Sequence, residues 1–530
     1  MNGALMKASS RFAIAAALGL ALGAGSAGAA DLGGNCCADL EERVAELEAT
    51  TARKGNRKMS LTITGQVNRV VMWYNDGGRS DTYFGLDNTN SSSRFSLLGE
   101  AKVTPAVKTG FEIMIEIEAG GTSSKTSQFD EDGRISSTGG WGIGNMSSLN
   151  TVNADAYFGD ARRAAWWIEH KDIGRLTVGR YEGAGAIQTI DLGGVSVAGG
   201  ASFGLLGGGT FLRSSNSGQI SSISVANLVD PAAAQGRQEL IRYDSPTWHG
   251  FTATASIGES SKNPTWGAML RYANEFSGFR IAAGIGYENS RDKASPTFFN
   301  QDAATVGTYA GSSPDTSAWG MGLSAMHVPT GLFLQGSYIA ASYDSLVLGD
   351  GYWGTSSICS GSTGRVGAGS PPPVCDNTGA KSDANQWHVQ GGITKNWFGL
   401  GNTSLFAEYG RSNDWGAQDG TGRDFPNEGL TGAPFITGVG NTNFTGVANV
   451  TDTRVSMFGL GAVQNLDAAA TELYLTWRRF DAKVNGDEFS CTGGSAQSGG
   501  GAGTSCTGVA EGAPRFDNVD IVGAGARIKF

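Results

Sequence analysis

Long apolar runs are scarce in this chain. Beyond residue 30 no stretch approaches the roughly 18 apolar residues that a membrane-spanning helix requires, which excludes a helical membrane protein. Proline is also scarce, at 13 of 530 residues, and glycine shows no period of three, so a collagen-like fibre is excluded as well. Charged residues make up only 17% of the chain, below the roughly 25% of an average soluble domain. A different class of protein must explain this low charge.

Histidine is rare too. The 4 histidines, at positions 170, 249, 327 and 388, are scattered, and no spacing among them suits a metal site or a catalytic triad. We therefore expect no enzyme activity, no metal and no cofactor. The net charge of −10 argues against a nucleic-acid partner, because phosphate backbones attract basic proteins.

Glycine and aromatic residues are abundant by contrast. The chain has 82 Gly, 24 Phe, 13 Tyr and 12 Trp. Aromatic side chains in such number provide too many apolar anchors for a disordered chain. The composition therefore favours a glycine- and aromatic-rich β protein.

The N-terminus has the layout of a secretory signal peptide. Lys7 and Arg11 precede an apolar run over residues 12–24, and small residues follow over residues 26–30. The run is short and lacks a charged flank after it, which disfavours the alternative of a membrane anchor. Gly33 occupies the place where a lipoprotein signal before Cys36 and Cys37 would have Leu. We expect residues 1–30 to be a signal peptide and the mature chain to be exported.

A short heptad-like segment follows over residues 31–58. Leu40, Val44, Leu47 and Thr51 lie on one face of a helix, with charged residues between them. Two interpretations remain open. The segment is either an isolated amphipathic helix, which is marginal in water, or a small coiled coil between subunits.

The remaining four cysteines form two close pairs, each in a stretch rich in Gly and Ser. Cys359 lies near Cys375, and Cys491 lies near Cys506. Exported proteins are oxidised, so we expect each pair to form a disulfide within its own loop.

From residue 59 to the C-terminus the sequence alternates with period two. Leu61 and Ile63 share one face while Thr62 and Thr64 share the other, which is the pattern of a strand with one apolar and one polar side. The pattern recurs in about sixteen segments, each near the 9 to 11 residues that a tilted strand needs to cross a bilayer. The links between them alternate between short ones, such as 104–108, 171–173 and 245–249, and mostly long ones. A soluble β-helix or adhesin would instead have near-uniform repeats.

We therefore predict that residues 59–530 form an all-β transmembrane antiparallel barrel of about sixteen strands, with long external loops and both chain ends at the periplasmic side. Charged residues such as Arg94, Glu112, Glu116 and Glu408 alternate with apolar neighbours in these segments. Charges at bilayer depth are tolerable where they face a water-filled lumen. A barrel of this size has an interior too wide for side chains to fill.

The chain resembles the porins of alphaproteobacteria over nearly all of its mature length. The resemblance rests on MSLTITGQ (59–66), RFSLLG (94–99), LTVGR (176–180), RYDSPTWHGF (242–251) and the final RIKF (527–530). It implies a sixteen-stranded homotrimer in the bacterial outer membrane, through which small hydrophilic solutes diffuse passively. The terminal Phe530 matches the aromatic residue that signals to the barrel-assembly machinery in that family. Outer-membrane lipids would surround the barrel.

The resemblance also implies that the third long loop, about 183–236, folds into the lumen and narrows the pore. Its richness in Gly, Ala and Leu suits a packed loop. We expect acidic residues of the loop to face a basic wall across the constriction. The acidic candidates are Glu182, Asp191 and Asp230, and the basic candidates are Arg94, Arg163, Arg180 and Arg242.

Ion preference is the least constrained property. Inward acids and bases are nearly balanced along the strands, so we expect weak selectivity with a modest preference for cations from the acidic mouth. A channel that prefers one sugar or organic ion is the main alternative function. An outer-membrane enzyme or an adhesin fits less well.

Overall fold

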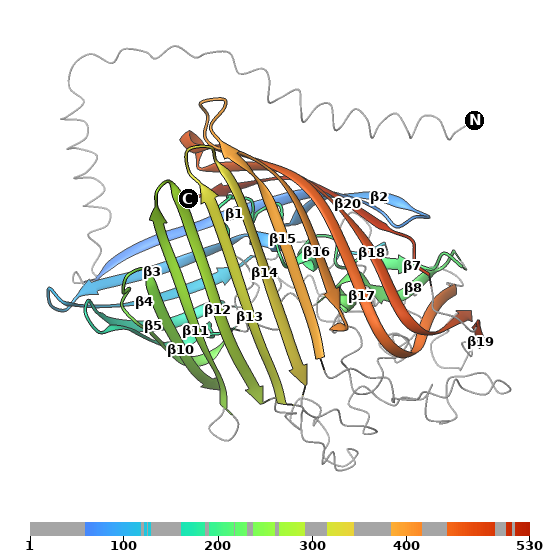
Figure 1. The fold of residues 1–530 in the computed structure, drawn as a ribbon, viewed down its shortest axis with the longest axis horizontal. Helices are drawn as coiled ribbons and strands as arrows, with labels where there is room; N and C mark the ends of the chain where they lie inside the picture. Colours follow the sequence, from blue (N-terminus) through green and yellow to red (C-terminus); the bar gives the residue numbers. More distant parts are fainter. Residues whose placement is uncertain are drawn as a thin grey trace. The chain divides into compact units, whose positions relative to one another are not determined.

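In the computed structural model, residues 59–117, 121–124, 126–128, 161–185, 190–216, 218–229, 237–259, 264–291, 315–343, 383–415, 443–492, 505–510 and 515–530 are described. They form a closed antiparallel β-barrel of 16 strands, which confirms the predicted fold class (Figure 1). The signal peptide predicted over 1–30, the segment predicted over 31–58 and Asp230 lie outside the described residues.

Each barrel strand pairs with the next along the chain, and the last pairs with the first. The barrel strands are β1 (Ser60–Asn75), β3 (Arg94–Lys102), β4 (Val107–Glu116), β5 (Ala161–His170), β6 (Gly174–Glu182), β9 (Arg237–Asp244), β10 (Phe251–Glu259), β11 (Pro264–Phe276), β12 (Phe279–Arg291), β13 (Asp315–His327), β14 (Leu332–Tyr343), β15 (Asp383–Lys395), β16 (Thr403–Asn413), β17 (Asn443–Leu466), β18 (Thr471–Thr492) and β20 (Val519–Lys529).

Short segments complete the described part of the chain. The strands are β2 (Ser80–Asp87), β7 (Phe211–Arg213), β8 (Ile220–Ser224) and β19 (Ser505–Ala510), and the 3-10 turns are η1 (Thr89–Ser91), η4 (Phe203–Leu205), η5 (Val225–Leu228) and η8 (Asp467–Ala469). None of the helices in the described ranges has the length and apolar character to cross a membrane.

The two ends of the barrel sheet meet at β1 and β20. Gln66 lies opposite Lys529, and the backbone N–H and C=O of Phe530 bond to Gly65 at 3.0 and 2.9 Å. The chain therefore ends at the side of the barrel where the connections are short, such as η8 between β17 and β18.

Side chains alternate along the strands as the period-two pattern predicts. On β1, Leu61 and Ile63 are each 61% exposed on the outer face, whereas Asn68 is fully buried on the inner face. The apolar outer face suits lipid, and the polar inner face lines the lumen.

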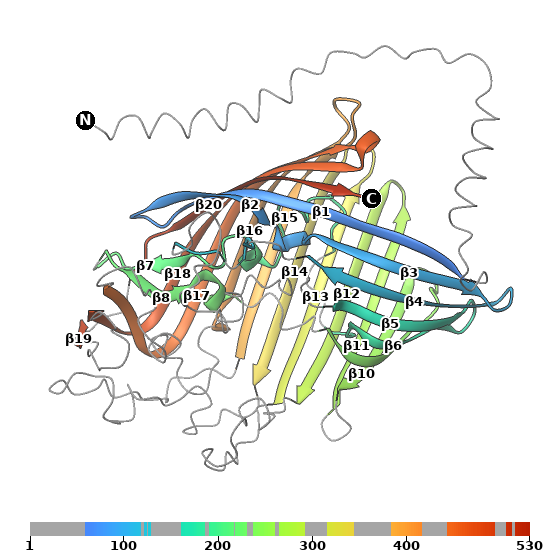
Figure 2. The ribbon, with the colours of Figure 1, turned by 180° about the vertical axis from the view of Figure 1, so that it is seen from behind.

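The third long connection lies inside the barrel. Its described part carries β7 and β8, which lie beside β17 and β18 in two opposite views (Figures 1 and 2). Apolar side chains of this loop are fully buried against inward residues of the wall, including Val70 and Met457. The buried loop residues are Val195, Val197, Ala198, Phe203, Leu206, Leu212, Ile223, Val225, Leu228 and Val229. An apolar core therefore fills one side of the lumen.

The second strand of the barrel is interrupted. β2 pairs with the half of β1 from Arg69 onward, and β3 pairs with the half that ends at Gln66. Residues 88–93 connect the two pieces and leave the sheet through η1. Ser91, Ser92 and Ser93 are thus placed inside the barrel, where they form hydrogen bonds with Gln66, Asn68 and Glu116.

One of the predicted cysteine pairs lies on neighbouring strands. Cys491 of β18 is opposite Cys506 of β19 in the antiparallel register. Directly opposite residues have Cα atoms about 4.5–5.5 Å apart, a spacing within the range that disulfides adopt. Cys36, Cys37, Cys359 and Cys375 lie outside the described residues. Both disulfides stay predictions. Peptide mapping without reductant tests them, and a free thiol at any of Cys359, Cys375, Cys491 or Cys506 would contradict the pairing.

Candidate functional site

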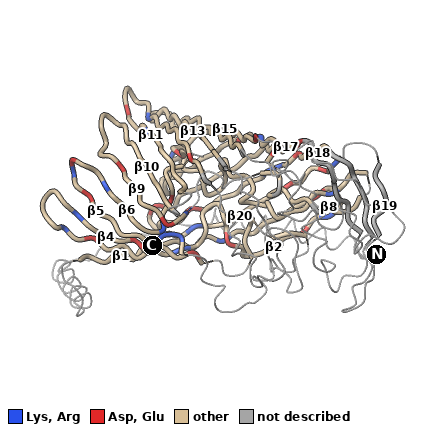
Figure 3. The backbone as a smooth tube through the Cα atoms, turned by 90° about the horizontal axis from the view of Figure 1, so that it is seen from below, with Lys and Arg blue, Asp and Glu red and all other residues tan. Residues whose placement is uncertain are grey.

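Arginines gather on the wall of the lumen that the third loop leaves uncovered. Figure 3 shows charged residues of both signs on the strands of this part of the barrel. We call the set of arginines and acidic residues on β3, β4, β5, β6, β9 and β11 the arginine wall. It consists of the inward Arg94, Arg163, Arg242 and Arg271, of Arg162 in β5 and of Arg237 at the first position of β9, together with Glu112, Glu116, Glu182 and Asp244.

A β-bulge turns two successive arginines inward. Met114 pairs with Arg163, but the next residue, Ile115, pairs with Ala161, so Arg162 is an extra residue in β5. Strict alternation would place Arg162 on the outer face. The bulge instead lets Arg162 reach the inner carboxylate of Glu116, while Arg163 keeps its own inward position.

Arg163 and Glu182 are the centre of an ion-pair network at the end of β6. The Arg163 guanidinium lies 2.8 Å from Glu182 and 3.1 Å from Glu112, and Arg237 approaches Glu182 at 3.2 Å. Arg242 donates to the Glu182 carbonyl oxygen at 3.1 Å. Three of the predicted site residues, Glu182, Arg163 and Arg242, are therefore brought together.

A second ion pair lies near the end of β9. Arg242 binds both carboxylate oxygens of Asp244, at 2.8 and 2.9 Å, and Thr254 donates to the same carboxylate at 2.7 Å. This bidentate contact fixes the Arg242 side chain across the inner face of the strand.

Two guanidinium groups of the arginine wall have no ion pair within the described ranges. Arg94 lies opposite Glu116 in the register, yet Glu116 contacts Arg162 and Ser92. Arg271 faces inward on β11 beside Thr252, and no ion pair is formed by it in the described part of the chain. Each carboxylate of the wall already has an arginine partner, so the wall carries excess positive charge.

Arg180 does not belong to this wall, which corrects the sequence prediction. It is opposite Ala164 and shares its face of β6 with Leu176 and Val178, which lie opposite the exposed residues Ile168 and Trp166. This is the outer face of the barrel. The Arg180 guanidinium donates to the Ala161 carbonyl oxygen at 2.8 Å. The inward positions of β6 are Thr177, Gly179 and Tyr181. These residues are not uniformly polar, so the sequence does not show which face of β6 is the inner one.

Asp191 lies on the opposite side of the lumen from the arginine wall. Its carboxylate accepts from the N–H groups of Gly194, Val195 and Ser196 at 2.7–2.9 Å, and Gln335 of β14 donates to it at 3.3 Å. The carboxylate thus fixes a turn of the third loop. In the described structure Asp191 is not brought together with the predicted arginines.

A buried ionic cluster that the sequence did not reveal anchors the third loop. Glu408 of β16 and Arg478 of β18 have side chains with no exposed surface and meet at 2.7 Å, and His388 of β15 lies 3.0 Å from the same carboxylate. The Gly200 N–H donates to Glu408 at 3.1 Å, and Arg478 donates to the Phe203 carbonyl oxygen at 3.3 Å. We call these three side chains the loop clamp.

A glycine permits this approach of the loop. A Cβ atom at Gly199 would lie 2.9 Å from the Glu408 carboxylate and 2.8 Å from the Gln390 amide. A larger residue would therefore separate the loop backbone from the clamp.

A second buried carboxylate holds the hairpin of β7 and β8. Asp76, in the turn after β1, is fully buried and binds Arg213 through both oxygens at 2.8 and 3.1 Å, while Gln128 donates at 3.0 Å. Burial alone would raise the pKa of Asp76, but the hydrogen bonds from Arg213, Arg79, Gln128 and Gly78 outweigh it and lower that pKa. The anchor therefore keeps its charge until the pH falls below the ordinary range of aspartate.

The sequence did contain signals for some of the missed residues. Arg478 belongs to the inward series Tyr474, Thr476, Arg478 and Phe480, which period-two alternation could have identified. Arg162 could not be found in this way, because its inward position depends on the bulge. No group of three or more His, Cys, Asp or Glu suited to a metal ion occurs among the residues that the structure describes.

Residues 13–485 match the family model described as Gram-negative porin. The chain belongs to the Gram-negative porin family. It is an outer-membrane porin, which confirms the function and location predicted from the sequence. No curated protein sequence matches this porin.

Several solved structures are similar to this chain at low identity. An anion-selective porin from Comamonas acidovorans is 15% identical with a TM-score of 0.45, covering 89% of this chain and 100% of the other. A trimer form of OmpT, an outer membrane protein of Vibrio cholerae, is 13% identical with a TM-score of 0.41, covering 89% and 99%. OmpF of Salmonella typhi, in complex with daunomycin, is 11% identical with a TM-score of 0.39, covering 89% and 98%.

Proposed function

We propose that this porin favours anions over cations. The observation that carries the proposal is the charge of the arginine wall, where Arg94 and Arg271 form no ion pair with any acidic residue that the structure describes. The buried Glu288 of β12 adds one carboxylate to the inner face of the neighbouring strand, and guanidinium groups still outnumber carboxylates.

The third loop does not supply the negative charge that would neutralise the arginine wall. The charged residues in the described part of the third loop are Asp191 and Arg213. The first accepts from backbone N–H groups and the second is paired with Asp76. Charges at the narrowest part of a pore govern permeation, because salt screens more distant ones within about 8 Å. The proposed preference is therefore opposite in sign to the one expected from the acidic composition.

The zero-current potential of the native porin under a potassium chloride gradient tests this proposal. We expect the sign that marks chloride as the more permeant ion, and we expect Arg94→Ser to shift the potential towards cations. A potential of cation-selective sign in the native porin would contradict the proposal. Asp191→Asn should leave the potential nearly unchanged, since its carboxylate faces its own turn.

We further propose that the porin assembles as a homotrimer, as the family resemblance implies. Val67 and Val71 on the outer face of β1 are 48% and 38% exposed. A neighbouring copy packed on this face would bury these apolar side chains, which supports the assembly.

The terminal residue is proposed to act in assembly. Phe530 is 62% exposed, and its ring lies close enough to Gly65 that a Cβ there would be 2.6 Å from it. It touches neither the arginine wall nor the loop clamp in the described structure, so Phe530→Ser should lower the yield of trimer on unheated gels without altering the conductance of the trimers that form. Normal yield from this variant would argue against the role, and a native porin that migrates as a monomer would refute the trimer.

A further inference from the structure

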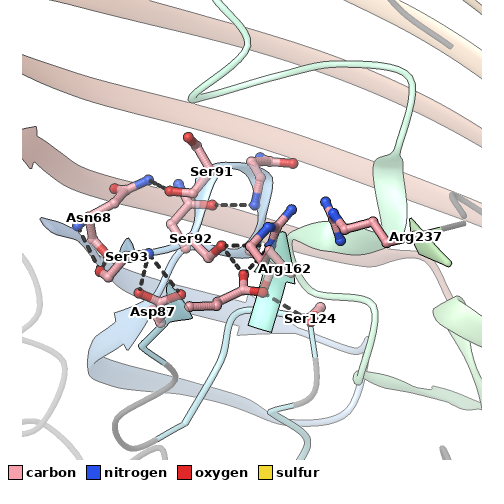
Figure 4. A network of polar contacts seen from close by, with 12 residues as sticks. Asn68, Asp87, Ser91, Ser92, Ser93, Ser124, Arg162 and Arg237 are labelled. Carbon is pink, nitrogen blue, oxygen red and sulfur yellow. Dashed lines mark hydrogen bonds and ion pairs between the residues drawn. The ribbon is translucent and has the colours of Figure 1, made fainter. Parts of the chain in front are cut away.

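The interruption of the second barrel strand brings hydroxyl groups to the bulge of β5. Residues 88–93 leave the sheet at the level of Arg162, and Ser92 Oγ accepts from the Arg162 guanidinium at 3.2 Å. Ser92 also contacts the carboxylate of Glu116 (Figure 4). Gln66 holds this segment by donating to the carbonyl oxygens of Ser91 and Ser92 at 2.8 Å each. The hydroxyl and the guanidinium are therefore held in place by the wall and are not free to swing with the loop.

Three arginines lie around Ser92 and Glu116 with too few carboxylates to neutralise them. Arg94 is opposite Glu116 in the register, Arg162 pairs with the same carboxylate, and the positive charge of Arg162 repels both Arg94 and Arg237. Glu116 is already paired with Arg162. Arg237 shares Glu182 with Arg163, at 3.2 Å against 2.8 Å for the closer partner. In Figure 4 the Arg237 side chain extends towards Arg162. Positive charge is thus concentrated at this point and only partly neutralised.

We propose that Arg94, Arg162 and Arg237 form a binding site for a small dianionic oxyanion inside the pore. This proposal rests on the proposed anion preference and names its substrate class. Planar guanidinium groups match the paired oxygens of phosphate or carboxylate, and two charges on the ligand relieve the repulsion between neighbouring arginines. Chloride lacks both the paired oxygens and the second negative charge, so it relieves this repulsion less.

Glu116 keeps the site from holding its ligand too tightly. Its carboxylate accepts hydrogen bonds from Arg162 and Ser92, and its negative charge would repel a bound oxyanion. Conduction requires a site that attracts a solute and still releases it. Arg242 and Arg271, towards the other end of β9 and β11, provide the next positive charges along the lumen.

Block of the chloride current by inorganic phosphate tests the site. We expect millimolar phosphate at a pH where it is mainly dianionic to reduce the current through the native porin in planar bilayers. Arg94→Gln should raise the half-blocking concentration about tenfold, the equivalent of one charged hydrogen bond. Arg237→Gln should act in the same direction and serves as a second variant if the first assembles poorly.

Arg271→Gln is the matched control, because it also removes a positive charge that has no ion pair among the described residues of the lumen. It should lower the anion preference as Arg94→Gln does, while changing the phosphate block by about twofold or less. If both variants lose the block by phosphate equally, the site is overturned, because phosphate would then respond to the overall positive charge of the lumen and not to three particular arginines. Succinate in place of phosphate tests an organic dianion at the same site, and block by either dianion that Arg94→Gln weakens supports the site. Anion preference without block by phosphate or succinate would overturn the site alone, and cation preference would overturn the proposed function on which it rests.

Discussion

Replacing Glu408 by alanine is expected to destabilise the folded barrel by about 3–5 kcal/mol, because it leaves the guanidinium of Arg478 buried without its carboxylate. Arg478 and Glu408 have side chains with no exposed surface, so water cannot take the place of the lost partner. The same change removes the acceptor of the Gly200 N–H. We therefore also expect the third loop to loosen and the single-channel conductance to rise.

Asp520→Ala is the matched control for this variant. Asp520 forms an ion pair of similar length with Arg479, also on β18, but the Arg479 side chain is 49% exposed. Because the Arg479 guanidinium is half exposed, water can solvate it after the carboxylate is lost, so stability should fall much less than in Glu408→Ala and conductance should change little. The double variant Glu408→Leu with Arg478→Met should recover much of the stability without restoring the loop contacts. Unfolding in urea and planar-bilayer recordings measure both effects. A Glu408→Ala porin with native stability and native conductance would show that the loop clamp does not hold the loop.

The barrel could be predicted from the sequence because its cause is local. Apolar and polar faces must alternate along every strand that separates lipid from water. On β4 the exposed Ile113 and the buried Glu112 and Glu116 follow this rule, and so do Leu61 and Asn68 on β1. The alternation of short and long connections indicated that each strand pairs with the next one along the chain.

The site was only partly predictable because its contacts depend on register and on one bulge. Arg94, Arg163 and Arg242 follow the alternation and lie on the inner face. Arg162 faces inward only through the extra residue in β5. Arg180 was assigned to the wrong face because glycine and tyrosine on β6 give no clear apolar side.

Long-range partners were beyond sequence reasoning for the same reason. Glu408 was expected to face inward, but its partner Arg478 lies two strands away and meets it under a loop from elsewhere in the chain. The apolar residues of the third loop were a usable signal, since Val195, Val197 and Phe203 would be unusual in a loop exposed to water.

We infer that the open pore runs between the arginine wall and the third loop, and that this loop covers the inner face of β17. The most direct measurement is the loss of conductance when a bulky charged thiol reagent is added to single-cysteine substitutions on each side, with the native porin as the baseline for its own cysteines. Arg94→Cys lies on the open wall, whereas Met457→Cys lies on β17 where Met457 is fully buried beneath the loop. We predict that the reagent reduces conductance through Arg94→Cys and leaves Met457→Cys at the native baseline. Equal reduction at both positions would contradict this position of the pore, because the face of β17 would then line the open lumen.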